Sequence, residues 1–310
     1  MADTRRSRCT RTCVATIGVV IAAPMTWGIN ASLNSRATYQ RFRMDAPRRA
    51  QAFEAARRAS SSDRVRLNVT TVARSPPIVR IERFLSDAEC DYLMDMHAPV
   101  LTSCFPGLPE PLVFWLGPWA ATGSPRVCRE MNMGTIPKHA PGNEMLRAVN
   151  DRMDSLVKHM KPPDRSPAMD FQLVQYRRGG KFRAHQDSWV GDSGSTAMPL
   201  TMMVFLNEPE EGGKTVFPHA GTDGIGVEVQ PRKGELLVWT SCPEHAARSE
   251  NGGTIWPASL QSTHAGSRLT NGDKWILNRF FWRPGPGQLA CPIAMADLLE
   301  ISSLEVAYAL

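Results

Sequence analysis

Two short segments of the chain contain side chains that would suit a single metal ion. His185 and Asp187 are separated by one residue within FQLVQYRRGGKFRAHQDSW, Phe171–Trp189. Alternate side chains of an extended strand point to the same face, so these two lie about 6–7 Å apart along the backbone. A second histidine, His264, lies in QSTHAGSRLTNGDKW. Two histidines and one carboxylate form the facial triad of non-haem iron(II) oxygenases, which leaves coordination positions open.

A lysine follows the second histidine and begins an apolar run. Lys274 opens KWILNRFFW, ten residues after His264. A buried ammonium group is costly to desolvate unless a carboxylate pairs with it, so we expect an acidic cosubstrate as its partner. Between the two segments, EEGGKTVFP at 210–218 contains a glycine pair that permits a tight turn. The short strand after that turn would place Thr215 and Phe217 on one face.

These motifs occur together and in an order that resembles a known family. Tyr176-x-x-Gly-x-x-Phe182-x-x-His185-x-Asp187, then EEGGKTVFP, then His264-x-Gly-x₇-Lys274-Trp275 is similar to the catalytic domain of prolyl 4-hydroxylases, over roughly Ile78 to Trp282. These enzymes are iron(II)- and 2-oxoglutarate-dependent dioxygenases with a double-stranded β-helix (jelly-roll) core. The resemblance implies that His185, Asp187 and His264 hold iron(II), and that Lys274, Tyr176 and Thr215 bind 2-oxoglutarate.

The resemblance also implies a reaction of the procollagen-proline 4-dioxygenase type. Such an enzyme hydroxylates proline in a peptide or protein substrate, consumes dioxygen and 2-oxoglutarate, releases succinate and carbon dioxide, and uses ascorbate. Asp187 favours hydroxylation, because alanine or glycine in its place would open a metal position for halide. A structural zinc site is the alternative, but it prefers four protein ligands and often cysteine. Neither ligand segment contains a cysteine.

Three positions concern the substrate side of the expected site. Phe182 and Phe280 stand where the family usually has tyrosine and tryptophan, so the apolar wall is kept but two hydrogen-bonding groups are lost. Arg129 in VCREMN resembles the substrate-side arginine of the family. Dioxygenase chemistry therefore has more support than proline as the target. The alternatives are the same oxygenase acting on another peptide residue or a small molecule, and a non-catalytic binding module that retains the fold.

The chain pattern predicts a mostly β fold with flanking helices, in which N-terminal helices brace the jelly-roll core. Ser86-x-x-Glu89 is a capping box that begins a helix over 86–97, and an amphipathic stripe predicts a second helix over 143–160. Residues 99–127 read as a long loop with four aromatic residues. The expected strands are 171–177, 181–186, 199–206, 214–217, 226–230, 235–240, 262–266 and 274–282.

Composition divides the 310 residues unevenly. Residues 1–66 hold 13 arginines and 4 acidic residues, a net charge of +9, which leaves −3 for the rest of the +6 chain. The basic balance therefore belongs to the leader and gives no support for nucleic-acid binding. We expect a basic N-terminus with a signal-anchor or signal peptide at 1–30, a stem or linker at 31–75, the dioxygenase domain at 76–285 and a C-terminal tail at 286–310.

The N-terminal segment bears on localisation. Four arginines precede an apolar stretch at 13–29, which is near the lower length limit for a membrane span. This pattern favours a secretory or single-pass type II membrane protein of the endoplasmic reticulum or Golgi lumen, with organelle import as the alternative. Asn30 and Asn68 begin glycosylation acceptor patterns. Seven cysteines define no disulfide framework, although Cys104 and Cys128 bracket a loop and either pair or remain free thiols.

Overall fold

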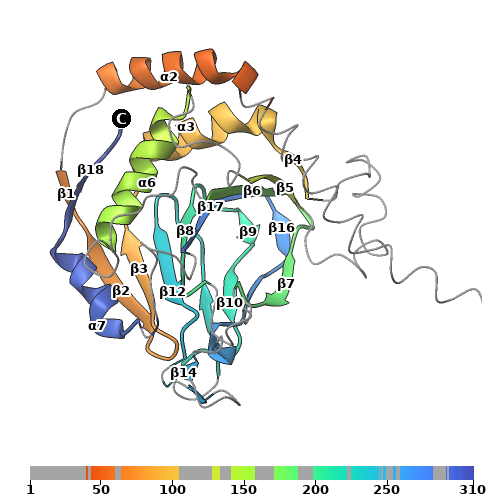
Figure 1. Cartoon of the computed structure of the whole chain (residues 1–310). Helices are drawn as coiled ribbons and strands as arrows, with labels where there is room; N and C mark the ends of the chain where they lie inside the picture. The colour runs from red at the N-terminus through yellow and green to blue at the C-terminus, as the bar shows by residue number, and fades with distance from the viewer. Residues whose placement is uncertain are drawn as a thin grey trace, which may run out of the picture.

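The computed structural model describes residues 43–59, 64–104, 128–132, 141–157, 171–187, 198–221, 225–243, 254–255, 259–281 and 293–310, together with residues 40, 245, 247–248 and 291. Two antiparallel sheets dominate this part of the chain. The larger sheet has the strand order β2-β3-β12-β8-β17-β6-β5-β4, and the smaller has the order β11-β10-β15-β7. Figure 1 shows the strands of both sheets below the three longest helices, α2, α3 and α6.

The strands of the larger sheet are β2 Asn68–Ala73, β3 Ile78–Glu82, β4 Thr102–Ser103, β5 Arg129–Asn132, β6 Phe171–Tyr176, β8 Leu200–Phe205, β12 Leu236–Thr240 and β17 Lys274–Phe281. Those of the smaller sheet are β7 Phe182–His185, β10 Thr215–Phe217, β11 Val227–Val229 and β15 His264–Gly266. Three short pairs complete the set: β1 Arg64–Arg66 with β18 Glu305–Ala307, β9 Glu211–Gly212 with β16 Leu269–Asn271, and β13 Ala247–Arg248 with β14 Thr254–Ile255.

The path of the chain between the two sheets is that of a jelly roll. From β6 the chain passes to β7 in the smaller sheet, returns to β8, passes to β10 and β11, returns to β12, and repeats the crossing through β15 to β17. The central strands are therefore ordered β12-β8-β17-β6 opposite β11-β10-β15-β7. All eight predicted strands are present, with ends that differ by at most two residues. The predicted fold class, a mostly β jelly roll with flanking helices, is confirmed.

Strands β8 and β12 at the centre of the larger sheet are mostly apolar because both of their faces are buried. Every residue of β8 and β12 is buried. One face of the sheet packs under the helices, with Met202, Val204 and Val238 in the cluster there. Met203 and Trp239 belong to a second cluster, between the two sheets. Alternate residues of one strand thus serve two cores, which explains the continuous apolar runs.

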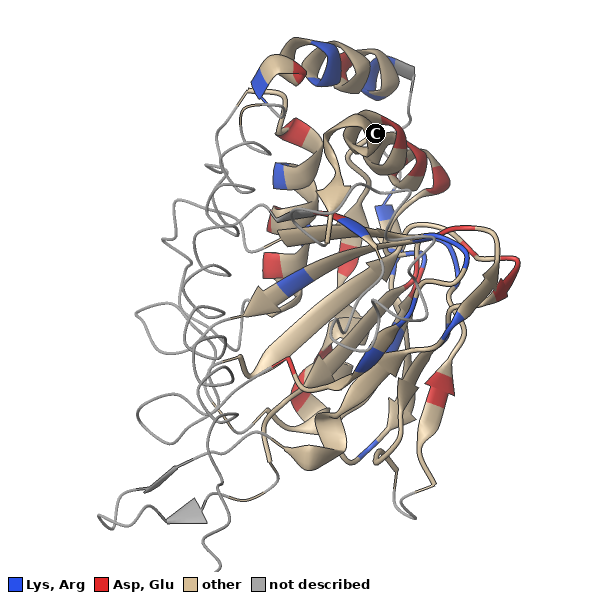
Figure 2. Ribbon diagram, turned by 90° about the vertical axis from the view of Figure 1, so that its right-hand side faces the viewer, with Lys and Arg blue, Asp and Glu red and all other residues tan. Residues whose placement is uncertain are grey.

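Helices cover one side of the larger sheet. The helices are α2 Ala46–Ala59, α3 Asp87–His97, α6 Glu144–Leu156 and α7 Met295–Leu299, with 3₁₀ turns η1 Ala98–Val100, η2 Leu260–Ser262 and η3 Glu300–Ser303. The predicted capping box is present: the Ser86 hydroxyl accepts from the Glu89 amide, and the Glu89 carboxylate accepts from the Ser86 amide. Helix α6 ends at Leu156 rather than at 160, and residues 158–160 lie outside the described part. In the side view of Figure 2, basic and acidic residues are interleaved over helices and strands.

The predicted stem at 31–75 differs from the structure over 46–73. Helix α2 packs Phe53 against Tyr92 of α3, with ring centroids 6.3 Å apart, and the Tyr92 hydroxyl donates to the carbonyl of Arg49. Strand β2 pairs with β3 as the edge of the larger sheet. These contacts join residues far apart in sequence, so periodicity within the segment does not reveal them. The described part of the folded domain therefore begins with α2 rather than near residue 76.

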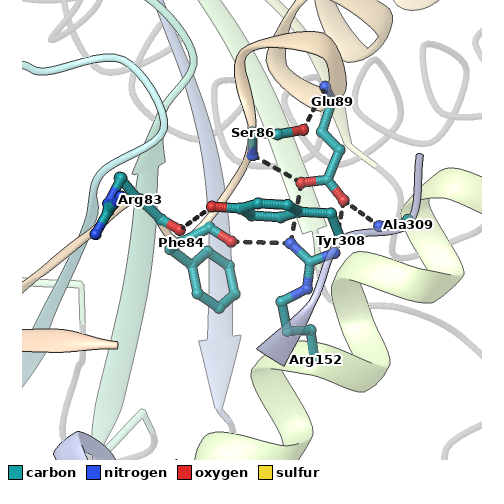
Figure 3. A network of polar contacts seen from close by, with 7 residues as sticks. All are labelled: Arg83, Phe84, Ser86, Glu89, Arg152, Tyr308 and Ala309. Atoms are coloured by element: carbon teal, nitrogen blue, oxygen red, sulfur yellow. Dashed lines mark hydrogen bonds and ion pairs between the residues drawn. The ribbon is translucent and has the colours of Figure 1, made fainter. Parts of the chain in front are cut away.

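The predicted tail at 286–310 also packs on the domain from residue 293 onward. Strand β18 pairs with β1, and Leu298 and Ile301 are fully buried. Figure 3 shows how this end is held: the Glu89 carboxylate accepts from the Ala309 amide and from the Arg152 guanidinium, which lies over the Tyr308 ring. A buried ion pair between α3 and α6 therefore also binds the C-terminal segment.

Two disulfides lie within the described residues. Cys104–Cys128 joins the ends of the predicted loop, and Cys242–Cys291 is a pairing that the sequence spacing did not indicate. The aromatic residues of that loop, Phe105, Phe114, Trp115 and Trp119, lie outside the described part, as does the predicted apolar leader at 13–29. In the part that is described, no helix is long and apolar enough to cross a bilayer.

Candidate active site

The structure brings the three predicted metal ligands together at the mouth of the jelly roll. His264 on β15 lies directly opposite His185 on β7, and Asp187 follows two residues after His185. The Asp187 Oδ1 atom is 3.5 Å from His185 Nε2 and 3.6 Å from His264 Nε2. One ligand atom from each residue lies within 4.8 Å of the other two. Strand pairing therefore produces the cluster that the H-x-D spacing anticipates.

Hydrogen bonds fix which atom of each ligand faces the shared centre. His185 Nδ1 lies 2.8 Å from the carbonyl oxygen of Arg183, and His264 Nδ1 lies 3.0 Å from that of Ser262. An Nδ1–H donated to a carbonyl leaves Nε2 unprotonated and able to coordinate a metal. The Thr201 hydroxyl donates to Asp187 Oδ2 at 2.8 Å, which leaves Oδ1 toward the two rings. In this tautomer the inner atoms of the three ligands are His185 Nε2, His264 Nε2 and Asp187 Oδ1, each of which can bind a metal.

The electrostatics of Asp187 agree with a carboxylate ligand. Burial alone would raise the pKa of Asp187, but the two histidines and the Thr201 hydrogen bond outweigh it and hold that pKa below its usual value. Two imidazole nitrogens and one hard carboxylate suit iron(II), with positions left for a chelating cosubstrate. A structural zinc site would need a fourth ligand. Within the described residues, no further histidine, cysteine or acid joins this cluster.

Lys274 lies in the same pocket as the ligand cluster, and its ammonium group lacks an anionic partner among the described residues. The side chain is 4% exposed, and its Nζ donates a long hydrogen bond of 3.4 Å to the Thr215 hydroxyl. The Phe205 ring lies 5.4 Å from Nζ. Burial lowers the pKa of Lys274 to about 7. A buried cation without a carboxylate is destabilising by itself and becomes favourable when an anionic ligand pairs with it.

The other two predicted 2-oxoglutarate residues lie beside this lysine. Tyr176 at the end of β6 is the cross-strand partner of Lys274, and both side chains line the pocket. Thr215 begins β10 two residues after Gly213, and Gly212 and Gly213 have φ values of 79° and 67°. Side chains other than glycine rarely adopt that backbone conformation, which explains the glycine pair of EEGGKTVFP. The pocket thus has a cationic and hydroxylated end and a metal-ligating end.

The three substrate-side residues fall in different places. Phe182 and Phe280 both line the pocket, and the Phe182 ring centroid is 3.7 Å from that of His185. Arg129 does not line it. Arg129 pairs with Gln175, whereas the neighbouring Glu130 pairs with Val174, so the two side chains of β5 lie on opposite faces of the sheet. The Arg129 guanidinium donates to the carbonyl of Leu101 instead.

Sequence reasoning missed several residues that line the pocket, four of them of particular interest. Thr201, Met203, Trp239 and Asn278 come from the central strands β8, β12 and β17. The sequence alone could have identified Asn278. It lies four residues after Lys274 in the same predicted strand, and residues an even number of positions apart share a strand face. His219 and His245 are exposed and do not line the pocket, and His159 lies outside the described residues.

Comparison with known proteins agrees with this arrangement. Residues 171–282 match the family described as the 2OG-Fe(II) oxygenase superfamily. The chain is 26% identical over 212 residues to probable prolyl 4-hydroxylase 3 of Arabidopsis thaliana, which covers 62% of this chain and 64% of that protein. It is 24% identical over 230 residues to prolyl 4-hydroxylase subunit alpha-1 of Rattus norvegicus, which covers 72% of this chain and 37% of that protein. Part of each relative therefore lies outside the similarity.

Solved structures give weaker matches. The viral collagen prolyl hydroxylase of Paramecium Bursaria Chlorella virus-1, in its 2OG complex, aligns with a TM-score of 0.42 at 21% identity, over 66% of this chain and 94% of that chain. A Pseudomonas putida prolyl-4-hydroxylase aligns with a TM-score of 0.42 at 16% identity, over 67% and 93% respectively.

Proposed function

We propose that the chain is an iron(II)- and 2-oxoglutarate-dependent oxygenase that hydroxylates proline in peptide or protein substrates, because residues 171–282 match the 2OG-Fe(II) oxygenase superfamily and the chain is similar to prolyl 4-hydroxylases. One observation carries the proposal. Three potential metal ligands and a buried lysine that has no anionic partner among the described residues line a single pocket. A molecule with an anionic group at each end, such as 2-oxoglutarate, would chelate a metal at one end and pair with the lysine at the other.

The protein's residues have separate tasks in this proposal. His185, Asp187 and His264 would hold iron(II) through Nε2, Oδ1 and Nε2 respectively. With dioxygen and 2-oxoglutarate, the bound iron supplies the oxidising chemistry that hydroxylates a C–H bond and releases succinate and carbon dioxide. Lys274 and the Thr215 hydroxyl bind the distal carboxylate, and that pairing restores the ammonium charge that burial disfavours. Thr201 positions Asp187.

Apolar walls between the two ends would exclude water from the reacting atoms. Phe182, Trp239 and Phe280 line the pocket near the ligand cluster, and the Trp239 ring centroid is 4.9 Å from that of His264. A dry pocket strengthens the ion pair at Lys274 and limits side reactions of the oxidant. The proline target rests on the named relatives. Phe182 and Phe280 favour a second candidate, the same oxygenase chemistry on another residue or a small molecule.

We also propose that the protein works in an oxidising compartment such as the lumen of the endoplasmic reticulum or Golgi. Four of the described cysteines form two disulfides, Cys104–Cys128 and Cys242–Cys291. Disulfides persist in oxidising compartments and are rare in the cytosol. The arginine-rich, apolar leader is consistent with membrane anchoring or secretion. Treatment of intact microsomes with protease would test this: a protected catalytic domain is expected, and cleavage without detergent would contradict the proposal.

Turnover assays separate the proposed substrate from the coarser chemistry. The full chain would be supplied with iron(II), ascorbate, 2-oxoglutarate and a proline-rich peptide, and succinate would be measured. We expect the peptide to stimulate succinate formation, and His185→Ala to abolish it. Turnover that no proline peptide stimulates would reject the prolyl substrate and retain the oxygenase. Absence of turnover by folded, iron-loaded protein would favour a binding module.

A further inference from the structure

Asn278 is a buried polar residue in the pocket wall to which none of the roles above applies. It lies on β17 at an alternate position from Lys274 and Phe280, so all three side chains face the pocket. The residue is 7% exposed. Its Oδ1 atom is fully buried and accepts no hydrogen bond from the described residues. A buried acceptor without a donor is unfavourable, and such atoms in a pocket point to a ligand group.

Neighbouring side chains determine which end of the Asn278 amide is presented. Gln172 lies directly opposite Asn278 across the β6–β17 pair. Gln172 Nε2 donates to the Glu130 carboxylate at 3.0 Å, and a carboxylate only accepts, so Gln172 must direct its Oε1 the other way. Asn278 Nδ2 donates to that Oε1 at 3.4 Å. The chain Glu130–Gln172–Asn278 therefore orients Asn278 so that Oδ1 remains as the free acceptor.

The same chain sets the charge on this side of the pocket. The Glu130 side chain lies on the face of β5 that continues the pocket side of β6 and β17. The Arg129 side chain lies on the opposite face. The hydrogen-bonded chain Glu130–Gln172–Asn278 thus begins at a carboxylate rather than at a guanidinium. A substrate carbonyl or carboxylate would meet an acceptor here, so a donor group is the complement. Because Asn278 is neutral and Phe280 lies beside it in the wall, an uncharged N–H suits the position better than a cation.

We propose that Asn278 Oδ1 is a specificity-determining acceptor for a backbone N–H of the bound peptide. The inference rests on the proposed peptide oxygenase activity. A proline residue has no backbone N–H, so the donor belongs to a residue beside the proline in the bound peptide. The interaction would discriminate peptides by position and would not contribute to 2-oxoglutarate binding. Loss of a donor from a site built to accept it weakens recognition strongly, because the buried acceptor is left unpaired.

The test pairs a protein variant with a modified substrate. Asn278→Leu keeps the side-chain shape and removes the acceptor, and we expect the KM for the peptide to rise about tenfold while the KM for 2-oxoglutarate is unchanged. Gln175→Leu is the matched control. Gln175 is a buried amide on β6 that faces away from the pocket and donates to Asp273, so its variant should retain the peptide KM.

A scan of peptides N-methylated at single positions keeps the protein unmodified and so does not depend on the folding of a variant. One methylation should raise the peptide KM for the wild type and have no further effect in Asn278→Leu. An unchanged peptide KM for Asn278→Leu would overturn this inference but not the proposed function. The same holds if methylation at no position changes the peptide KM of the wild type. A wild type that turns over no unmodified peptide would overturn the proposed function and this inference with it.

Discussion

His264 lies directly opposite His185 in the antiparallel pair of β15 and β7, although the two residues belong to the second-last and second strands of the jelly roll. The two ring centroids are consequently 4.3 Å apart. The register of the pair shifts after His264, between His264 and Gly266. The metal centre therefore depends on strand pairing over a long stretch of sequence, and Asp187 completes it from the end of β7.

Lys274→Met should abolish the preference of the pocket for an anionic cosubstrate. Hydrogen bonds to charged groups contribute about 1.5–3 kcal/mol, so we expect the KM for 2-oxoglutarate to rise about 10- to 100-fold. The melting temperature without 2-oxoglutarate should increase, because a desolvated cation is replaced by an apolar chain of similar length. Thermal unfolding with and without 2-oxoglutarate measures both effects. A variant stabilised by 2-oxoglutarate as strongly as the wild type would contradict this role.

The binding of 2-oxoglutarate should depend on pH through the same residue. Burial lowers the pKa of Lys274 to about 7 from its ordinary value of 10.5. The unfolded chain therefore binds more protons than the folded chain between those values, and stability without 2-oxoglutarate should rise from about pH 7 to about pH 10.5. Pairing with a carboxylate requires the protonated lysine, so affinity should fall above pH 7, by up to about tenfold per pH unit.

Calorimetric titration with 2-oxoglutarate across this pH range measures the expected proton uptake. Lys274→Met serves as the control, since it should lose the pH dependence of both stability and affinity that this group causes. An affinity of the wild type that is constant from pH 7 to pH 9 would contradict the prediction.

Thr201→Val should weaken metal binding without removing a ligand. The Thr201 hydroxyl donates to Asp187 Oδ2 at 2.8 Å, and groups that orient metal ligands typically affect metal affinity by about 10- to 100-fold. Anaerobic titration with iron(II) would measure the loss. Thr240→Val is a matched control, because the buried Thr240 hydroxyl on β12 donates to the carbonyl of Pro199 rather than to a ligand. Equal losses in both variants would indicate a general effect of packing.

Arg152→Leu should destabilise the fold and release the C-terminal segment. Removal of one partner from a buried ion pair leaves the Glu89 carboxylate uncompensated, which typically costs about 3–5 kcal/mol. Because Glu89 also binds the Ala309 amide, amide hydrogen exchange near the C-terminus should become faster. The variant should also unfold at a lower urea concentration. Tyr308→Phe removes only the hydrogen bond to the Arg83 carbonyl, which is worth about 1 kcal/mol. A cost of Arg152→Leu no larger than that of Tyr308→Phe would contradict this interpretation.

Local sequence patterns account for what was predicted correctly. The capping box at Ser86 marks the start of α3, and short apolar runs separated by Gly, Pro and Asn turns mark the eight central strands. The one-residue spacing of His185 and Asp187 anticipates that they share one face, because alternate residues of a strand point the same way. These features depend on residues that are near one another in sequence.

The features that were not predicted depend on pairings between distant segments. Residues 31–75 were expected to be a stem or linker outside the dioxygenase domain, yet β2 pairs with β3 at the edge of the larger sheet, and β1 pairs with β18 from the other end of the chain. Arg129 was assigned to the substrate side from a family resemblance, but its register in β5 places its side chain on the face away from the pocket, and a shift of one residue exchanges the two faces of a strand. The polar chain to Asn278 requires the same register and was missed for the same reason.

Mass spectrometry of a proline-rich peptide after reaction under labelled dioxygen tests the central claim most directly. The wild-type chain, with iron(II) and 2-oxoglutarate, should add one labelled oxygen atom to a proline, and His185→Ala should add none. Dependence on 2-oxoglutarate should shift to higher concentration in Lys274→Met. A wild type that forms succinate and leaves every proline unmodified would contradict prolyl hydroxylation, and hydroxylation that persists in His185→Ala would contradict the assigned metal centre.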